Sequence, residues 1–213
     1  MTTPTVIDKT AAERGAANLG SHAEASASFS WLKARGLVDG LPAGGLNIAH
    51  EAVDRHAHDD HGGKPAVRWL GRHGETRDFS YRQLSDLSNR FANVLHGLGV
   101  HKGDSVFVLA GRIPELYVAV LGALKARCVV CPLFSAFGPE PIETRMRIGD
   151  ARVLVTTASL YARKVAGIRD KLPTLEHVLI VAEPGAAPLP ERTLDFAALT
   201  AGASPDYLIE PTD

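Results

Sequence analysis

The sequence predicts an α/β fold, a mostly parallel, doubly wound sheet with helices on both faces. The first observation is a strand–helix–strand pattern from Lys102 to Leu133, which has the length of one βαβ unit. The second is that two more helix–strand pairs follow at similar spacing, ending in a strand at His177 to Ala182. This alternation predicts parallel strands whose faces are covered by the connecting helices.

Composition sets the class of protein. The chain has 213 residues, of which 45% are hydrophobic and 22% charged, as in globular proteins that bury a core. A formal net charge of -1 gives no reason to expect a nucleic-acid partner. No apolar run is long enough to span a membrane, and Met1 to Asn18 lacks the apolar core of an export signal. We therefore expect a cytoplasmic protein with no membrane partner.

The sequence predicts an N-terminal extension, residues 1–45, and a main domain, residues 46–213. The main domain begins before the first βαβ unit. The extension is expected to hold short helical pieces. In the main domain, apolar spacing predicts an amphipathic helix over Leu46 to Ala57. Two short runs, Ala66 to Leu70 and Thr76 to Tyr81, flank a glycine-containing turn and predict a β-hairpin.

A long helix is predicted to follow the hairpin. Ser80 and Gln83 have the spacing of a capping box at its start, and Gly97 with Gly99 mark its end. Its apolar residues recur at intervals of three and four, at Leu84, Leu87, Phe91, Val94, Leu95 and Leu98.

The second half of the chain continues the alternation. Pro139 suits the first position of a helix that runs to about Gly149. The pattern then predicts a strand at Arg152 to Thr157 and a helix from Ala158 to Leu172. After the strand at 177–182 and a Pro/Ala/Gly-rich linker, we expect a short helix at Thr193 to Leu199 and an irregular tail.

Two groups of residues have the composition of metal or redox sites. Cys128 and Cys131 have the spacing of a redox pair, but residues three apart on a strand point to opposite faces, so we favour packing in the core. The histidines at positions 50, 56, 58 and 61, with Asp59 and Asp60, are dense enough to suggest metal ligands. We favour a solvated helix end for them, because no matching cluster occurs elsewhere in the sequence.

Phosphate binding has two candidate locations. Gly111 to Glu115 joins a strand to a helix, where a phosphate can bind, but it lacks the glycine pattern of a nucleotide loop and Pro114 removes a donor. Basic residues also gather on the late helices. They form either a solvated helix face, which we favour, or a site that captures an anion such as a nucleotide phosphate. They are Arg145, Arg147, Arg163, Lys164, Arg169 and Lys171.

An ordered set of motifs resembles the adenylate-forming ligases. Phe-Ser-Tyr-Arg-Gln-Leu at 79–84, Lys-Gly-Asp at 102–104 and Leu-Gly-Ala-Leu-Lys-Ala at 121–126 occur in the order and spacing of that superfamily. Phe-Ser-Trp at 29–31 and Val-Asp-Arg-His at 53–56 are similar to its AMP-forming acetyl-CoA synthetase branch. The resemblance covers the chain from about Ser28 onward.

The resemblance implies a two-step ligase reaction. A carboxylate attacks the α-phosphate of ATP to give an acyl-adenylate, and the thiol of coenzyme A then displaces AMP; Mg²⁺ offsets the phosphate charge. Acetate or another short carboxylate is the expected substrate. The alternatives are a medium-chain acyl-CoA synthetase, a peptide-synthetase-type adenylation domain, and a non-catalytic nucleotide-binding or interaction module.

The position of the chain within such an enzyme limits what it is expected to do. The glycine-rich phosphate loop of the family would be expected just beyond Asp213, so the chain resembles the N-terminal part of a synthetase. We expect no catalytic residue and no metal ligand in it, and no activity from it alone. We also expect self-association through apolar surface that the rest of the enzyme would cover.

The resemblance also implies coenzyme A contacts. The family's Gly-Gly-Phe-Ser-Pro-Glu turn corresponds to Ser-Ala-Phe-Gly-Pro-Glu at 135–140, in which both first glycines are replaced. The family's arginine pair aligns near Arg163 and Lys164. We therefore expect Phe137, Gly138, Arg163 and Lys164 to contact coenzyme A. A further departure is Arg127, where the family usually has glycine, and we expect its side chain to face solvent or an anion.

Overall fold

A computed structural model describes residues 8–18, 21–183, 185 and 188–212. The chain divides into two compact units, Met1–Asp39 and Gly40–Asp213. The first unit holds three short helices, α1 (Ala11–Gly15), α2 (His22–Ser28) and α3 (Trp31–Arg35). Each begins at a Ser or Thr whose hydroxyl accepts a hydrogen bond from a backbone N–H of the first turn. The predicted helical extension is thus confirmed.

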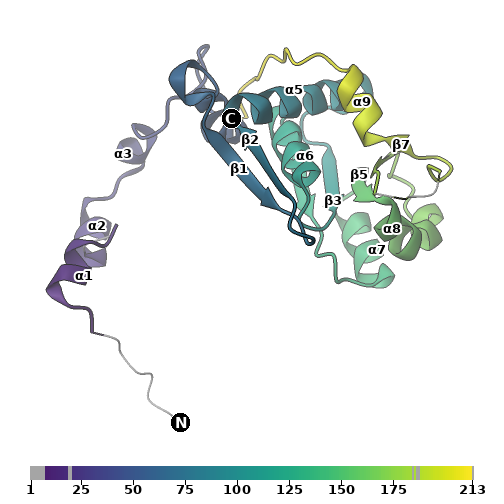
Figure 1. The fold of residues 1–213 in the computed structure, drawn as a ribbon, viewed down its shortest axis with the longest axis horizontal. Helices are drawn as coiled ribbons and strands as arrows, with labels where there is room; N and C mark the ends of the chain where they lie inside the picture. The colour runs from purple at the N-terminus through teal and green to yellow at the C-terminus, as the bar shows by residue number, and fades with distance from the viewer. Residues whose placement is uncertain (1–7, 19–20, 184, 186–187, 213) are drawn as a thin grey trace, which may run out of the picture. The chain divides into compact units, whose positions relative to one another are not determined.

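The second unit is built on a five-stranded parallel sheet (Figure 1). Its strands lie in the order β4-β3-β5-β6-β7. The second strand in sequence, β4, is therefore at one edge beside β3, and β5, β6 and β7 follow on the other side of β3. They are β3 (Ser105–Leu109), β4 (Val129–Pro132), β5 (Ala151–Thr157), β6 (His177–Val181) and β7 (Leu194–Asp195). The parallel sheet predicted from the alternating pattern is confirmed.

Helices cover both faces of this sheet. Val106 and Val108 of β3 pack into a core with α5 (Tyr81–Gly97), α6 (Pro114–Lys125) and α9 (Phe196–Gly202). The alternate residues Phe107 and Leu109 pack into a second core on the opposite face. That face carries α7 (Pro139–Ile148), α8 (Ala158–Leu160) and the turns η3 (Tyr161–Val165) and η4 (Ala166–Lys171). Helices on both faces make the sheet doubly wound, as predicted.

The hairpin and two helix starts are where the sequence predicts them. Strands β1 (Pro65–Leu70) and β2 (Thr76–Ser80) pair antiparallel. The Ser80 hydroxyl accepts from Gln83 N at 3.2 Å, and Gln83 Oε1 accepts from Ser80 N at 2.9 Å, which completes the capping box of α5. Pro139 opens α7.

The helix predicted over residues 46–57 is wrong in extent. The structure has α4 (Ile48–Ala52), followed by the 3₁₀ turns η1 (Asp54–His56) and η2 (Asp59–His61). Asn47 caps α4 by accepting from Ala49 N at 3.0 Å, and the α-helix stops at Val53, whose backbone angles are φ −131° and ψ −57°. After this break, the Asp54 side chain forms a buried ion pair, which is described below. The apolar spacing that predicted one continuous helix does not reveal this ion pair.

Two later predictions also need correction. Residues 158–171 are helical, but as one α-turn, a π-helical turn and a 3₁₀ helix rather than one α-helix. The last helix begins at Phe196 instead of Thr193, because residues 194–195 pair with β6 as strand β7. No helix of the described residues combines the length and the apolar character needed to cross a membrane.

Candidate ligand-binding turn at the carboxyl edge of the sheet

The segment that follows β4 crosses the carboxyl edge of the sheet. In the strand order β4-β3-β5, strand β3 lies between β4 and β5. The loops that follow β4 and β5 therefore begin on either side of β3. The helix after β3 lies on one face and the helix after β5 lies on the other, so the winding reverses between these two strands. Open α/β sheets bind their ligands at such a reversal, outside the carboxyl ends of the strands. The turn at residues 134–138 therefore lies where a ligand is expected.

Lys164 holds the shape of this turn. Its ammonium group donates hydrogen bonds to the backbone oxygens of Ser135, at 2.5 Å, and Phe137, at 2.6 Å. Lysine has three donors, so two of them are used within the protein. Lys164 is in η3, after β5, and so it ties the loop of one strand to the helical segment that follows another. In the structure, the main role of Lys164 is therefore to position the turn.

In this turn Gly138 is exposed, whereas Phe137 is half-buried against the core of one face of the sheet. The Arg145 guanidinium carbon lies 4.4 Å from the centroid of the Phe137 ring, a cation–π arrangement, and Phe134 contacts the same ring edge-on at 5.6 Å. Gly138 is the N-cap residue of α7, and a Cβ atom there would have no neighbour within 4 Å. The backbone at Gly138 is thus open to an approaching ligand.

Arg163 lies beside Lys164 in the chain but does not contact the turn. Its Nε donates to the Ser159 backbone oxygen at 3.1 Å, and its side chain is exposed. Within the part of the chain that the structure describes, its two terminal nitrogens have no hydrogen-bond or ion-pair partner. The structure therefore brings Phe137, Gly138 and Lys164 together and leaves the Arg163 fork available to an anion.

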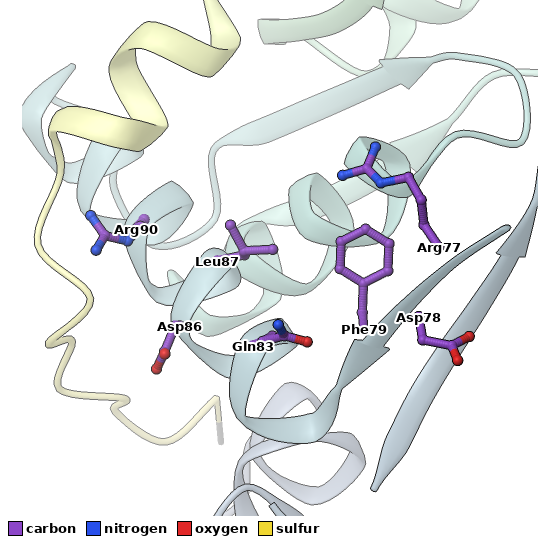
Figure 2. A pocket seen from close by; sticks show the side chains of 7 residues that line it. All are labelled: Arg77, Asp78, Phe79, Gln83, Asp86, Leu87 and Arg90. Carbon is purple, nitrogen blue, oxygen red and sulfur yellow. The ribbon is translucent and has the colours of Figure 1, made fainter. Parts of the chain in front are cut away.

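A pocket of about 480 Å³ lies elsewhere, between β2 and α5 (Figure 2). Arg77 and Phe79 project from β2 toward α5, whereas Asp78 projects to the other side of the strand. A more apolar pocket of about 270 Å³ shares Arg77 and Phe79 and continues toward α6 and Phe196. Sequence reasoning missed both pockets; the alternation of residues 77–79 along a strand was the only available signal.

A buried ionic network joins η1, α5 and α6. Lys125 is fully buried, and its ammonium group donates to Asp54 Oδ1 and to Asn89 Oδ1, each at 2.7 Å, and to Ser85 O at 3.2 Å. The Ser85 hydroxyl also donates to Asp54 Oδ1, at 2.6 Å. Burial lowers the pKa of Lys125, and the Asp54 charge opposes that shift. Sequence reasoning missed this network, for which the signal was a lysine at the end of an otherwise apolar helix.

The cysteines pack on opposite faces of the sheet, as predicted. Cys128 belongs to the core with α5 and α6, whereas Cys131 packs against the core of the other face. Burial raises the pKa of the Cys128 thiol to about 11 and also raises that of Cys131. In the described ranges, no three His, Cys, Asp or Glu side chains gather closely enough to hold a metal ion. We therefore assign no Mg²⁺ ligand to these residues.

The doubly wound fold, with a candidate site at the point of reversal, defines a nucleotide-binding type of α/β domain. The sequence model of the AMP-binding enzymes matches residues 53–208, most of the chain. The chain therefore belongs to the AMP-binding enzyme family, the adenylate-forming ligases.

Relatives narrow the comparison within that family. Acetyl-coenzyme A synthetase of Bacillus subtilis (strain 168) is 37% identical over 165 residues, which are 77% of this chain and 28% of the relative. Acyl-coenzyme A synthetase ACSM1, mitochondrial, of Mus musculus is 31% identical over 167 residues, 76% of this chain and 28% of the relative. The crystal structure of Brucella canis acyl-CoA synthetase superposes with a TM-score of 0.76 at 31% identity, covering 87% of this chain and 33% of that one. The chain thus spans about a third or less of the length of these relatives.

Proposed function

We propose that this chain is the N-terminal part of an ATP-dependent acyl-CoA ligase that activates acetate or another short carboxylate. The complete protein would form acyl-AMP and then transfer the acyl group to coenzyme A in the cytoplasm. The observation that carries the proposal is the family match over residues 53–208, and the similarity to acetyl-coenzyme A synthetases supports acetate. Mg²⁺ would neutralise phosphate charge during adenylation. The residues described here would supply the sheet and one ligand contact, not the reacting groups.

That contact is the turn at residues 134–138, which we propose binds coenzyme A. Phe137 and Gly138 would form the surface against the ligand, and Arg163 would bind a phosphate with its terminal nitrogens. Lys164 would act mainly by holding the turn, with one donor left for the ligand. The exposed Gly138 backbone and the open fork of Arg163 support this division of roles.

Calorimetric titration of this chain with coenzyme A tests the contact. We expect Arg163→Gln to weaken binding about tenfold, because a charge-assisted hydrogen bond to a phosphate is lost. The control is Arg147→Gln, which removes an exposed arginine from α7 and should leave the affinity unchanged. Absence of heat at millimolar coenzyme A would contradict the proposed contact.

The acyl substrate is tested on the product of the complete reading frame. Thioester formation with acetate, propionate and octanoate is measured against ATP and coenzyme A. Preference for acetate or propionate supports the proposal, and preference for octanoate would assign the protein to the medium-chain synthetases. Acyl-AMP without any thioester would instead indicate a peptide-synthetase type of adenylation domain. This chain alone is expected to form neither product.

A further inference from the structure

Another pocket lies at the opposite edge of the sheet from the candidate coenzyme A turn. Its volume is about 530 Å³, and it is lined by the residues around the first positions of β6 and β7. Arg169, His177 and Arg192 are its basic residues. Because β6 and β7 are parallel, their starts lie at the amino edge, whereas the turn at 134–138 follows the carboxyl end of β4. The two sites are therefore separated by the length of the strands.

Arg169 is a buried cation that lacks a carboxylate partner. Only 7% of the residue is exposed, and its terminal nitrogens donate to the backbone oxygens of Leu175 and Glu176. Its Nε is buried and has no hydrogen-bond partner. Among the described residues, no Asp or Glu forms an ion pair with it. A buried charge without a counter-charge is destabilising, so this guanidinium favours an anion close to it.

Arg192 adds a second positive charge at the same pocket. Its Nη1 lies 2.9 Å from Asp170 Oδ1, but the two side chains are 65% and 88% exposed, so this ion pair is weak. Burial lowers the pKa of Arg169, and the charge of Arg192 lowers it further, whereas the charge of Asp170 partly opposes both effects. The positive charges of two neighbouring guanidinium groups repel each other, and an anion bound between them stabilises both.

The other polar groups of the pocket are already engaged. The Glu176 carboxylate pairs with Arg152 at 3.2 Å, but Arg152 also pairs with Asp104 at 2.5 Å, so two carboxylates share one cation and Glu176 keeps part of its negative charge beside the pocket. The ring of His177 donates from Nε2 to the Leu98 backbone oxygen at 3.1 Å. Recognition in this pocket therefore rests on the two arginines.

We propose that this pocket binds a phosphate group, either free phosphate or a small phosphate monoester, through Arg169 and Arg192. Guanidinium groups match phosphate oxygens with paired N–H donors, and the volume admits an ester larger than phosphate itself. The site goes beyond the ligase function, because it lies at the other edge of the sheet and uses none of the residues of the coenzyme A turn.

The test is a titration of this chain with inorganic phosphate, with sodium chloride at equal ionic strength as the reference. Thermal unfolding and the backbone amide resonances of residues 175–178 and 192–194 are followed. We expect phosphate, and not chloride, to raise the unfolding temperature and to shift those resonances. A parallel titration with AMP distinguishes a monoester from free phosphate as the better ligand. Equal binding of AMP and unphosphorylated adenosine would overturn the proposal, since the nucleoside and not the phosphate group would then be recognised.

Two variants with opposite expected effects make the test sharp. Arg192→Gln should weaken phosphate binding about tenfold, because one charge-assisted fork is lost. Asp170→Asn should strengthen it, because the carboxylate that competes for Arg192 is removed. The matched control is Arg72→Gln, an exposed arginine of the hairpin turn, which should change nothing. Equal responses of all three variants, or equal effects of chloride and phosphate, would overturn the proposal.

Arg169→Lys examines the buried partner directly. It keeps the charge but removes the terminal nitrogens that hold the Leu175 and Glu176 backbone oxygens, so phosphate binding should weaken while coenzyme A binding at the turn stays as in the unmodified chain. If this variant does not fold, Arg192→Gln and Asp170→Asn still decide the outcome. Loss of coenzyme A binding in Arg192→Gln would contradict two separate sites.

Discussion

Lys125 shows how one side chain can tie distant parts of the chain together. It contacts Asp54 of η1 and Asn89 of α5 from the last position of α6. Both ionic partners belong to motifs by which the sequence resembles adenylate-forming ligases, Val-Asp-Arg-His and Leu-Gly-Ala-Leu-Lys-Ala. These motifs thus include a structural ion pair in addition to any residues that meet a ligand.

Replacing Lys125 by methionine should lower the free energy of unfolding by about 3–5 kcal/mol. The physical reason is that Asp54 would remain buried without its cation. Urea unfolding at pH 7 measures the change, with Lys102→Met, at an exposed turn position, as the control. Adding Asp54→Asn to Lys125→Met should recover part of the loss, because the unpaired charge is removed. A loss below about 1 kcal/mol would show that the network contributes little.

Cys128 should make the protein less stable at alkaline pH. Its thiol pKa is about 11 in the folded chain against 9.0 as the reference value, so between these values the unfolded state releases a proton that the folded state retains. The stability that this group contributes is complete below pH 9 and is lost as pH rises through 11, by at most about 3 kcal/mol. Lys125, whose folded pKa is lowered, contributes the opposite slope below 10.5, so the unmodified chain and Cys128→Ala must be compared at each pH.

The measurement is urea unfolding at intervals from pH 8 to 11. Cys128→Ala should decline less than the unmodified chain over that range. Cys131→Ala is the matched control, because its thiol is only half-buried. Parallel curves for the unmodified chain and Cys128→Ala would exclude this thiol as a cause of alkaline loss.

Arg127 departs from the family pattern at a position where the backbone conformation favours glycine. Its φ of 60° lies in the left-handed region, which favours glycine, the residue that the family usually has at this position. Its guanidinium pairs with Glu210. The expectation that this arginine faces an anion is confirmed, and the anion is part of the chain itself.

At the scale of elements, the crossing of α5 and α6 depends on Gly122. A Cβ atom there would lie 2.7 Å from the Ser88 backbone oxygen and 2.8 Å from Phe91 Cδ1. Gly122→Ala should therefore destabilise the protein by about 1–3 kcal/mol despite the better helix propensity of alanine. Gly97→Ala, where a Cβ has no neighbour within 4 Å, should be neutral or slightly stabilising in the same thermal unfolding experiment. Equal stability of the two variants would mean that the helices move apart without penalty.

The polar face of α5 is an element whose role the sequence does not reveal. Asn89, Arg90 and Asn93 occupy the side that a helical pattern assigns to solvent. In the structure they donate to backbone oxygens of residues 201–206, and Thr212 N then donates to Leu46 O at 2.8 Å. The irregular tail is thus held along α5 by side-chain donors, and such pairing has no local periodicity to predict it.

At the scale of the whole molecule, an exposed sheet edge favours association. Strand β4 is at the edge of the sheet, and Val129 on it is 51% exposed. Unpaired edge strands with apolar side chains pair with other chains, so we expect concentration-dependent self-association, as the sequence predicted. Light scattering during size-exclusion chromatography measures it.

Val129→Lys should shift that equilibrium toward the monomer, because a charge on an edge strand opposes pairing. Leu70→Lys, which places the same charge on an exposed apolar residue of the hairpin, is the control and should have less effect. A monodisperse monomer of the unmodified chain at all concentrations would contradict the expectation.

The sequence by itself determined the fold class, most element positions, the capping box at Ser80 and the opposite faces of Cys128 and Cys131. These follow from local periodicity and from hydrogen bonds between residues three apart, which the order of residues encodes directly. Only the tertiary structure decided that α4 stops at Val53 and that Lys125 pairs with Asp54. It also decided that Lys164, which was expected to contact the ligand, binds the backbone of the turn. Each of these depends on which distant segment supplies a buried partner. A buried charge or backbone oxygen needs an ion-pair or hydrogen-bond partner. Many positions of the chain could supply that partner, and tertiary packing determines which one does.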